Sequence, residues 1–153
     1  CSEISIFRFP NCSKRNETID VGCTPQMIGI GTDLVHIPRM QILLDKHGDK
    51  IAMRILSAAE FNQFQQSNKQ AAFLAKRFAA KEATSKALGT GFRDGLSLRH
   101  IEVNNDSKGK PILQFYHRGA ALLDELNIGK AMISLSDEGD YAIAYVVLME
   151  QIK

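Results

Sequence analysis

The sequence predicts an α+β fold in which helices pack on an antiparallel sheet. Its 153 residues correspond to one domain rather than two. Helix patterns dominate residues 38–88, whereas strands paired across turn residues dominate residues 99–150. This segregation of helices from antiparallel strands favours α+β architecture over a doubly wound sheet, in which the two would alternate.

The composition is that of an ordinary globular domain, with 44% hydrophobic and 24% charged residues. The formal net charge is only +2, so nothing in the composition calls for a polyanionic partner such as bulk nucleic acid. The longest strongly apolar run, residues 141–149, has the length of a strand and not the ~20 residues of a membrane-spanning helix. Integral membrane proteins of the helical class are therefore excluded.

Cysteines occur only at the start of the chain, at Cys1, Cys12 and Cys23. From Met27 onward there are none, so the body has no disulfide framework and fits a reducing, cytoplasmic location. Residues 1–26 have neither the order of a secretory signal nor the character of a domain. We interpret them as a non-native or upstream-translated extension and residues 27–153 as the functional domain.

The first predicted element is a strand at MIGIGTD, residues 27–33, which places Asp33 at its end. The alternative is that Asp33 is a plain helix N-cap. Pro38 is suited to the first turn of a helix, and Gly48 ends it. A second helical piece is predicted around residues 51–56.

Two further helices have recognisable ends. Ser57 followed by Glu60 is a capping-box pattern, which predicts a helix start. Asn68 is expected to cap a long alanine-rich helix over residues 69–88, which Gly89 closes.

The rest of the chain reads as two hairpins separated by a short helix. Turn residues 106–110 join the strands of the first hairpin, and residues 137–140 join those of the second. The predicted strands cover residues 99–104, 111–116, 131–136 and 141–150, and the helix covers residues 120–126.

The long helix carries charges on its apolar side. At about 100° per residue, Glu82 and Lys86 fall within the arc of Leu74, Phe78 and Ala79, which should be buried. The opposite side, expected to be solvated, holds Lys76, Arg77, Lys81 and Thr84. The simple structural explanation is an i,i+4 ion pair between Glu82 and Lys86. The alternative is that both face a site whose cation compensates the carboxylate.

A hard-cation site needs a second carboxylate, and Asp33 at the end of a glycine-containing strand is the natural candidate. Mg²⁺ commonly takes one or two carboxylates and completes its shell with water and phosphate oxygens. The turn of Gly89, Thr90 and Gly91 would offer amide groups, and Lys110 would offer an ammonium group, to a phosphate-containing ligand. Each glycine motif alone is weak evidence, and neither a P-loop nor a Rossmann fingerprint is present.

Other chemistries have little support. The four histidines show no zinc-binding spacing, and the sequence has no CxxC pair. Ser134 and Ser136 alternate within an apolar strand and lack the nucleophile-elbow motif.

Four motifs together resemble the short-type 4'-phosphopantetheinyl transferases, the holo-acyl-carrier-protein synthase family. They are GIGTDLVHIPRM at 29–40, RFAAKEATSKALGTGF at 77–92, GKPIL at 109–113 and ISLSDEGDYAIAYVVL at 133–148. The resemblance runs from Met27 to the C-terminus. It implies an α+β subunit that assembles into trimers with active sites between neighbours.

The resemblance also implies an activity, transfer of 4'-phosphopantetheine from coenzyme A to a serine of apo-acyl carrier protein in fatty acid biosynthesis. Asp33 and Glu82 match the family's Mg²⁺-binding acids, and whether Mn²⁺ replaces Mg²⁺ stays open. Lys86 matches a lysine that would stabilise or protonate the leaving phosphate, adenosine 3',5'-bisphosphate. The base that activates the serine is left open among a metal-bound water, Glu82 and Asp33.

Further positions match residues that contact coenzyme A or the carrier. Arg77, Lys81 and residues 89–91 match contacts to coenzyme A or its pocket, although an exposed helix face and a C-cap would explain them equally well. Asp137 stands where many members have a nucleotide-contacting histidine, which puts that contact in doubt. Arg39 matches a position that faces the acidic carrier protein.

Two other readings compete with this one. A non-enzymatic module that binds coenzyme A or carrier protein would not need the combination of Asp33, Glu82 and Lys86. A transferase with two such halves in one chain would not fit into the residues after Met27. One half must borrow its second wall from a neighbour, which predicts an oligomer.

Overall fold

The computed structural model describes residues 24–152 and has the predicted α+β architecture. The elements follow the order β1(Met27–His36), α1(Ile37–His47), α2(Asp49–Ile55), α3(Ala58–Gln65), α4(Gln70–Leu88), a 3₁₀ turn η1(Leu98–His100), β2(Ile101–Asn105), β3(Pro111–Phe115), α5(Arg118–Glu125), β4(Ile128–Glu138) and β5(Tyr141–Glu150). The predicted extension lies outside the described residues up to position 23. No helix of the described part is long and apolar enough to cross a membrane.

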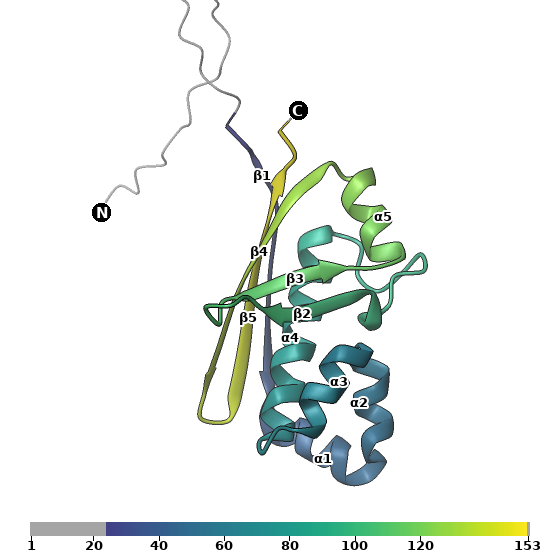
Figure 1. The fold of residues 1–153 in the computed structure, drawn as a ribbon, viewed down its shortest axis with the longest axis vertical. Coiled ribbons are helices and arrows are strands. Elements are labelled where there is room, and N and C mark those ends of the chain that lie inside the picture. Colours follow the sequence, from purple (N-terminus) through teal and green to yellow (C-terminus); the bar gives the residue numbers. More distant parts are fainter. Residues whose placement is uncertain (1–23, 153) are drawn as a thin grey trace, which may run out of the picture.

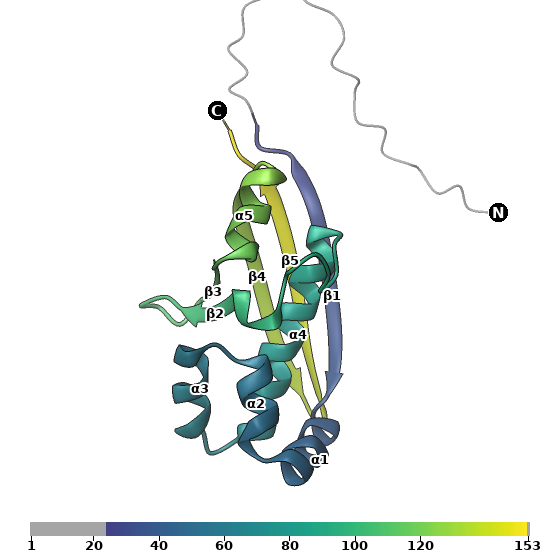
Figure 2. The same cartoon turned by 90° about the vertical axis from the view of Figure 1, so that its right-hand side faces the viewer.

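Two antiparallel sheets form the strand layer. The larger one has the order β1-β5-β4, and the smaller one is the β2-β3 hairpin, so both predicted hairpins are confirmed. The first long strand pairs with the last, in the register Asp33 to Ala144. In Figure 1 and Figure 2 the helices lie on one side of the larger sheet, with α4 directly against it and α2 and α3 beyond.

Local signals set most helix ends as predicted. Ser57 and Glu60 form a complete capping box at the start of α3. Gly48 follows α1, and Gly89 closes α4 with φ +73°, a left-handed conformation that glycine adopts without strain. The prediction that Asn68 caps α4 is wrong. The N-cap is Lys69, whose amide donates to Ser67 Oγ, and no side chain caps this end.

The prediction that α4 has one buried and one solvated side is also wrong. Leu74, Ala75, Ala79 and Ala83 are buried as expected, but the supposedly solvated Arg77, Lys81 and Thr84 are buried too. Lys86, placed on the buried arc, is exposed over 52% of its side chain. The reason is that α4 is the central element, covered by the larger sheet on one side and by α1–α3 and β2 on the other.

Lys81 is stabilised in this interior by Glu60. The ammonium lies 2.6 Å from Glu60 Oε2 and 2.7 Å from the Ile55 carbonyl oxygen, and both side chains are fully buried. The same carboxylate accepts the amides of Ser57 and Val103 at 2.8 and 2.9 Å. Burial lowers the pKa of Lys81, and the attraction of Glu60 opposes that shift. Glu60 therefore joins α3, α4 and β2 at one buried point.

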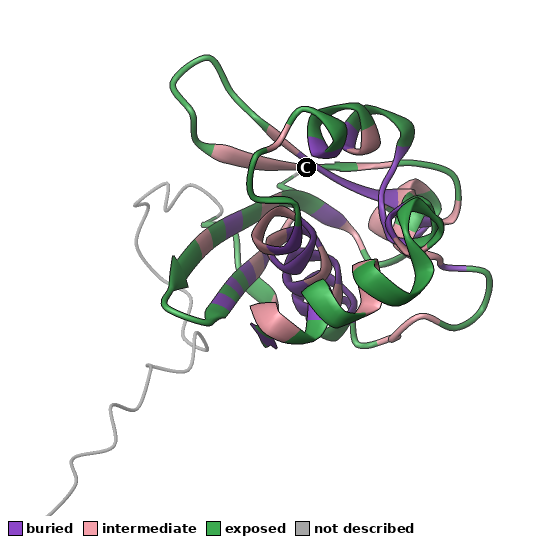
Figure 3. Cartoon of the chain, turned by 90° about the horizontal axis from the view of Figure 1, so that it is seen from below, coloured by how far each residue is buried: buried purple, intermediate pink, exposed green. Residues whose placement is uncertain are grey.

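The larger sheet leaves its other face uncovered. Residues alternate along its strands, which Figure 3 shows as bands of buried and exposed positions. The exposed side holds many large apolar side chains, at 36–60% exposure: Ile30, Leu34, Met132, Tyr141, Ile143 and Tyr145. An apolar surface of this kind on a domain usually marks an interface.

Candidate active site

The site begins with an unusually close approach between β1 and α4. A Cβ atom built on Gly31 would lie 2.0 Å from the Ala83 carbonyl oxygen, and one on Gly29 would lie 2.3 Å from that of Ala87. Only glycine allows the strand and helix backbones to touch in this way. The contact brings the first half of β1 beside the last turns of α4. The prediction that the strand ends at Asp33 is wrong, because β1 continues to His36.

Asp33, Glu82 and Lys86 meet at this junction, as the sequence predicts. Lys86 Nζ lies 2.7 Å from Asp33 Oδ1 and donates to the Thr32 carbonyl oxygen at 2.9 Å. Glu82 and Asp33 line one cavity of about 280 Å³. The simple i,i+4 explanation does not hold, because among residues 24–152 no ion pair joins Glu82 to Lys86 and the lysine reaches across to β1 instead.

The two carboxylates act on each other electrostatically. The pKa of Glu82 is raised, first by partial burial and second by the negative charge of Asp33, while Lys86 opposes the shift. Two carboxylates that lie close together despite their mutual repulsion can be stabilised by binding a divalent cation. The described residues contain no cluster of three or more His, Cys, Asp or Glu side chains that could hold a metal. A pair of carboxylates nevertheless fits Mg²⁺, which retains water and phosphate ligands.

This raised pKa predicts how Glu82→Gln changes stability. The folded protein is destabilised when Glu82 ionises, so the variant should be more stable than the wild type above the raised pKa, with metal removed by EDTA. The difference should narrow as pH falls and vanish below about 4.3, the pKa of an unfolded glutamate. Urea unfolding between pH 3.5 and 8 measures it, and a variant that is less stable at pH 8 contradicts the prediction.

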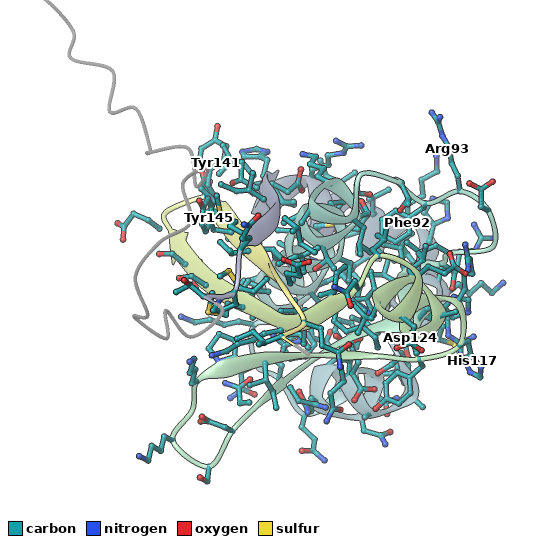
Figure 4. All side chains as sticks on the ribbon, turned by 90° about the horizontal axis from the view of Figure 1, so that it is seen from above. Phe92, Arg93, His117, Asp124, Tyr141 and Tyr145 are labelled. Carbon is teal, nitrogen blue, oxygen red and sulfur yellow. The ribbon has the colours of Figure 1, made fainter. Side chains whose placement is uncertain are left out.

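Arg39 belongs to the same cavity. It lies in the first turn of α1, which begins directly after β1. His36, Phe78 and Tyr141 complete this part of the wall, and the His36 and Tyr141 rings lie 5.1 Å apart. Figure 4 shows Tyr141 and Tyr145 next to one another beside the sheet. Sequence patterns did not reveal these three wall residues, because His36 and Tyr141 meet through the pairing of β1 with β5 and Phe78 reaches them through the packing of α4 on β1.

The other predicted ligand-binding residues do not line this cavity. Lys81 is inside the core, and Arg77 is 7% exposed with its guanidinium 4.5 Å above the Phe73 ring. Arg77 Nε is buried 3.8 Å from Glu60 Oε1 and has no hydrogen-bond partner among the described residues. Lys110 is exposed on the β2-β3 hairpin, and Asp137 near the end of β4 forms a 3.0 Å ion pair with Lys76.

The turn after α4 keeps the predicted glycine geometry. Gly89 and Gly91 both have positive φ, and the Gly91 amide donates to the Ser85 carbonyl oxygen. Thr90 Oγ1 is buried and has no hydrogen-bond partner within residues 24–152. A buried hydroxyl without a partner is unusual and is compatible with a ligand contact at this turn.

A larger cavity, of about 440 Å³, lies elsewhere, between the start of α3 and the end of β3. Its wall includes Arg99, His100, Glu102 and His117. It contains one carboxylate, which accepts hydrogen bonds from Asn104 and Tyr116. The smaller cavity is the better candidate of the two, because its wall holds two acids and one of them, Asp33, is bonded to the ammonium group of Lys86.

Comparisons with known proteins agree on one family. Residues 29–146 match the family model of the 4'-phosphopantetheinyl transferase superfamily. The holo-[acyl-carrier-protein] synthase of Halorhodospira halophila is 50% identical over 121 residues, which are 79% of this chain and 96% of that protein.

Solved structures agree with the sequence relatives. The holo-[acyl-carrier-protein] synthase of Neisseria meningitidis superposes with a TM-score of 0.77 at 42% identity, over 80% of this chain and 98% of that one. The enzyme of Bacillus anthracis, solved in complex with coenzyme A (3',5'-ADP), gives 0.68 at 36% identity, over 82% and 98%.

Proposed function

Because the chain belongs to the holo-[acyl-carrier-protein] synthase family of phosphopantetheinyl transferases, we propose that it transfers 4'-phosphopantetheine from coenzyme A to a serine of apo-acyl carrier protein. The reaction is Mg²⁺-dependent, releases adenosine 3',5'-bisphosphate and serves fatty acid biosynthesis in the cytoplasm. The domain at residues 27–153 carries it. The observation that supports this most strongly is that Asp33 and Glu82 line one cavity while Lys86 forms an ion pair with Asp33.

Each of these side chains has a task in the reaction. Asp33 and Glu82 would hold Mg²⁺, which when bound neutralises charge on the coenzyme A pyrophosphate. Lys86, exposed at the cavity edge, would stabilise the negative charge that develops on the leaving phosphate. The serine oxygen attacks the phosphorus atom that carries the pantetheine arm, and its proton passes to a general base, either Glu82, Asp33 or a water held at the site. The bond from that phosphorus to the bridging oxygen breaks, and the bridging oxygen leaves as part of adenosine 3',5'-bisphosphate.

A homotrimer would complete the site. Arg77, Lys110, Asp137 and the turn of residues 89–91 are proposed to contact coenzyme A, yet none of them lines the cavity of Asp33 and Glu82. In an assembly, some of these groups would face the cavity of a neighbouring subunit. The exposed apolar face of the larger sheet supplies the surface for such an assembly. Lys81 has no such role here, because its ammonium is buried on Glu60.

The carrier protein is expected to approach along α1. The Arg39→Glu variant should raise the KM for carrier protein by about tenfold or more, because it replaces attraction to an acidic partner with repulsion. Coenzyme A affinity should change little. Steady-state kinetics with each substrate varied, at low and high salt, measure the difference. Equal losses for both substrates would contradict the role of Arg39.

Mass spectrometry of purified apo-acyl carrier protein tests the function directly. The carrier is incubated with this protein, coenzyme A and Mg²⁺, with an EDTA control. A gain of one phosphopantetheine that EDTA abolishes supports the proposal. No gain with several carriers, from a folded protein that binds coenzyme A, would favour a non-enzymatic binding module.

A further inference from the structure

We propose that Lys86 is an internal counter-ion that competes with the divalent metal for Asp33, so that metal binding moves its ammonium group from Asp33 toward the substrate phosphates. This inference rests on the proposed function, because it concerns the same two carboxylates. It assigns Lys86 a second role besides stabilising the leaving phosphate.

The first reason to expect competition is that Lys86 contacts Asp33 directly. Its ammonium bonds Asp33 Oδ1 at 2.7 Å and the Thr32 carbonyl oxygen at 2.9 Å, and both partners are on β1. Lys86 makes no ion pair with Glu82, which lies one turn earlier on its own helix. The lysine therefore occupies one of the two carboxylate oxygens of Asp33, which is one of the acids proposed to bind the metal.

The second reason to expect competition is the limited space and the charge around the Asp33 carboxylate. The Asp33 side chain is only 18% exposed, which leaves little room around its carboxylate. Asp33, Glu82, Lys86 and the Arg39 of the same cavity carry a net charge of about zero, to which a divalent ion adds two positive charges. An ammonium group and a metal ion beside the same carboxylate repel each other, so each weakens the binding of the other.

The third reason is the position of Lys86, which allows its ammonium group to move away from Asp33. The residue lies in the last turn of α4, and 52% of its side chain is exposed. Its flexible stem lets the ammonium group leave Asp33 without movement of the helix. The released group stays at the edge of the cavity, where the pyrophosphate would lie. Metal binding would thus prepare the cation that the leaving phosphate requires.

A Mn²⁺ titration without coenzyme A, followed by water-proton relaxation, tests the competition. We expect Lys86→Met to bind Mn²⁺ about tenfold more tightly than the wild type, the equivalent of one modest charge interaction. Lys76→Met is the matched control, because Lys76 forms a similar exposed pair with Asp137, at 3.0 Å, outside the cavity. Its Mn²⁺ affinity should equal that of the wild type.

Two outcomes of the Mn²⁺ titration would contradict the proposal. Unchanged or weaker Mn²⁺ binding by Lys86→Met would overturn the proposal, since the lysine would then orient Asp33 rather than compete for it. Absence of binding in Lys86→Met at millimolar Mn²⁺ would also overturn it. Circular dichroism of each variant verifies that it is folded.

Lysine NMR on the methylated wild-type protein provides a second measurement. Titration with Mg²⁺ should shift the Nζ-methyl signal of Lys86 and leave that of Lys76 in place. A Lys86 signal that stays still while Mg²⁺ saturates would overturn the exchange. Neither measurement depends on transfer activity, so a failure of the proposed function would be seen separately, in the wild-type mass-spectrometric assay.

Discussion

The Glu82→Ala variant is expected to lose about 10²-fold or more in kcat/KM for carrier modification, and Asp33→Ala should lose as much. Each substitution removes one of the two carboxylates at the cavity, and groups that stabilise developing charge are commonly worth this factor. Both variants should remain folded, because neither side chain supports the core. Initial rates at saturating Mg²⁺ measure the loss.

A control separates metal binding from general negative charge. Glu138 is an exposed acid at the end of β4 and does not line the cavity, so Glu138→Ala should keep nearly full activity. The two active-site variants should also require more Mg²⁺ than the wild type for any residual activity. Near-normal turnover by a folded Asp33→Ala or Glu82→Ala protein would rule out the metal-binding role of that residue.

The largest effect on stability is expected from Lys81→Met, which should lower the free energy of unfolding by about 3–5 kcal/mol. The substitution nearly keeps the length of the side chain but removes the closer of the two cations that face the buried Glu60 carboxylate, which leaves only Arg77 Nε at 3.8 Å. The Ile55 carbonyl oxygen loses its donor as well. Urea denaturation measures the loss, with Lys46→Met at the exposed end of α1 as a control that should change little.

A double variant tests the explanation. Adding Glu60→Gln to Lys81→Met removes the buried negative charge while retaining an oxygen for the Val103 amide, so part of the stability should return. If Lys81 instead contacted coenzyme A, the single variant would keep its stability and raise the KM for coenzyme A. That result would restore the expectation drawn from the family resemblance.

Local chemistry made the elements and half of the site predictable. The capping box at Ser57, the proline at position 38 and the glycines at 48 and 89 act on their immediate neighbours, so each could be read without knowing the fold. Glu82 was found because a charge on an apolar stripe needs a partner, and Asp33 was the acid best placed to share one.

The features of the fold and site that the sequence did not predict depend on tertiary packing. A helical periodicity argument assumes one buried side, and α4 breaks that assumption because it lies between two layers. Nothing near Lys81 in the sequence indicates Glu60, which is 21 residues earlier. In the same way, His36 and Tyr141 become neighbours only through the pairing of β1 with β5. Only the structure therefore shows that α4 holds both a buried ion pair, at Lys81, and an exposed ammonium group, at Lys86.

The pairing of β1 with β5 has a consequence for the order in which the protein is made. The Thr32 hydroxyl donates to the Ala144 carbonyl oxygen, 112 residues further along the chain. During synthesis the strand that bears Asp33 must wait, without its sheet partner, until β5 has left the ribosome. Contacts of such long separation slow folding and leave an unpaired edge exposed meanwhile. Asp33 is thus translated long before β5, and its strand is completed only after β5 pairs with it.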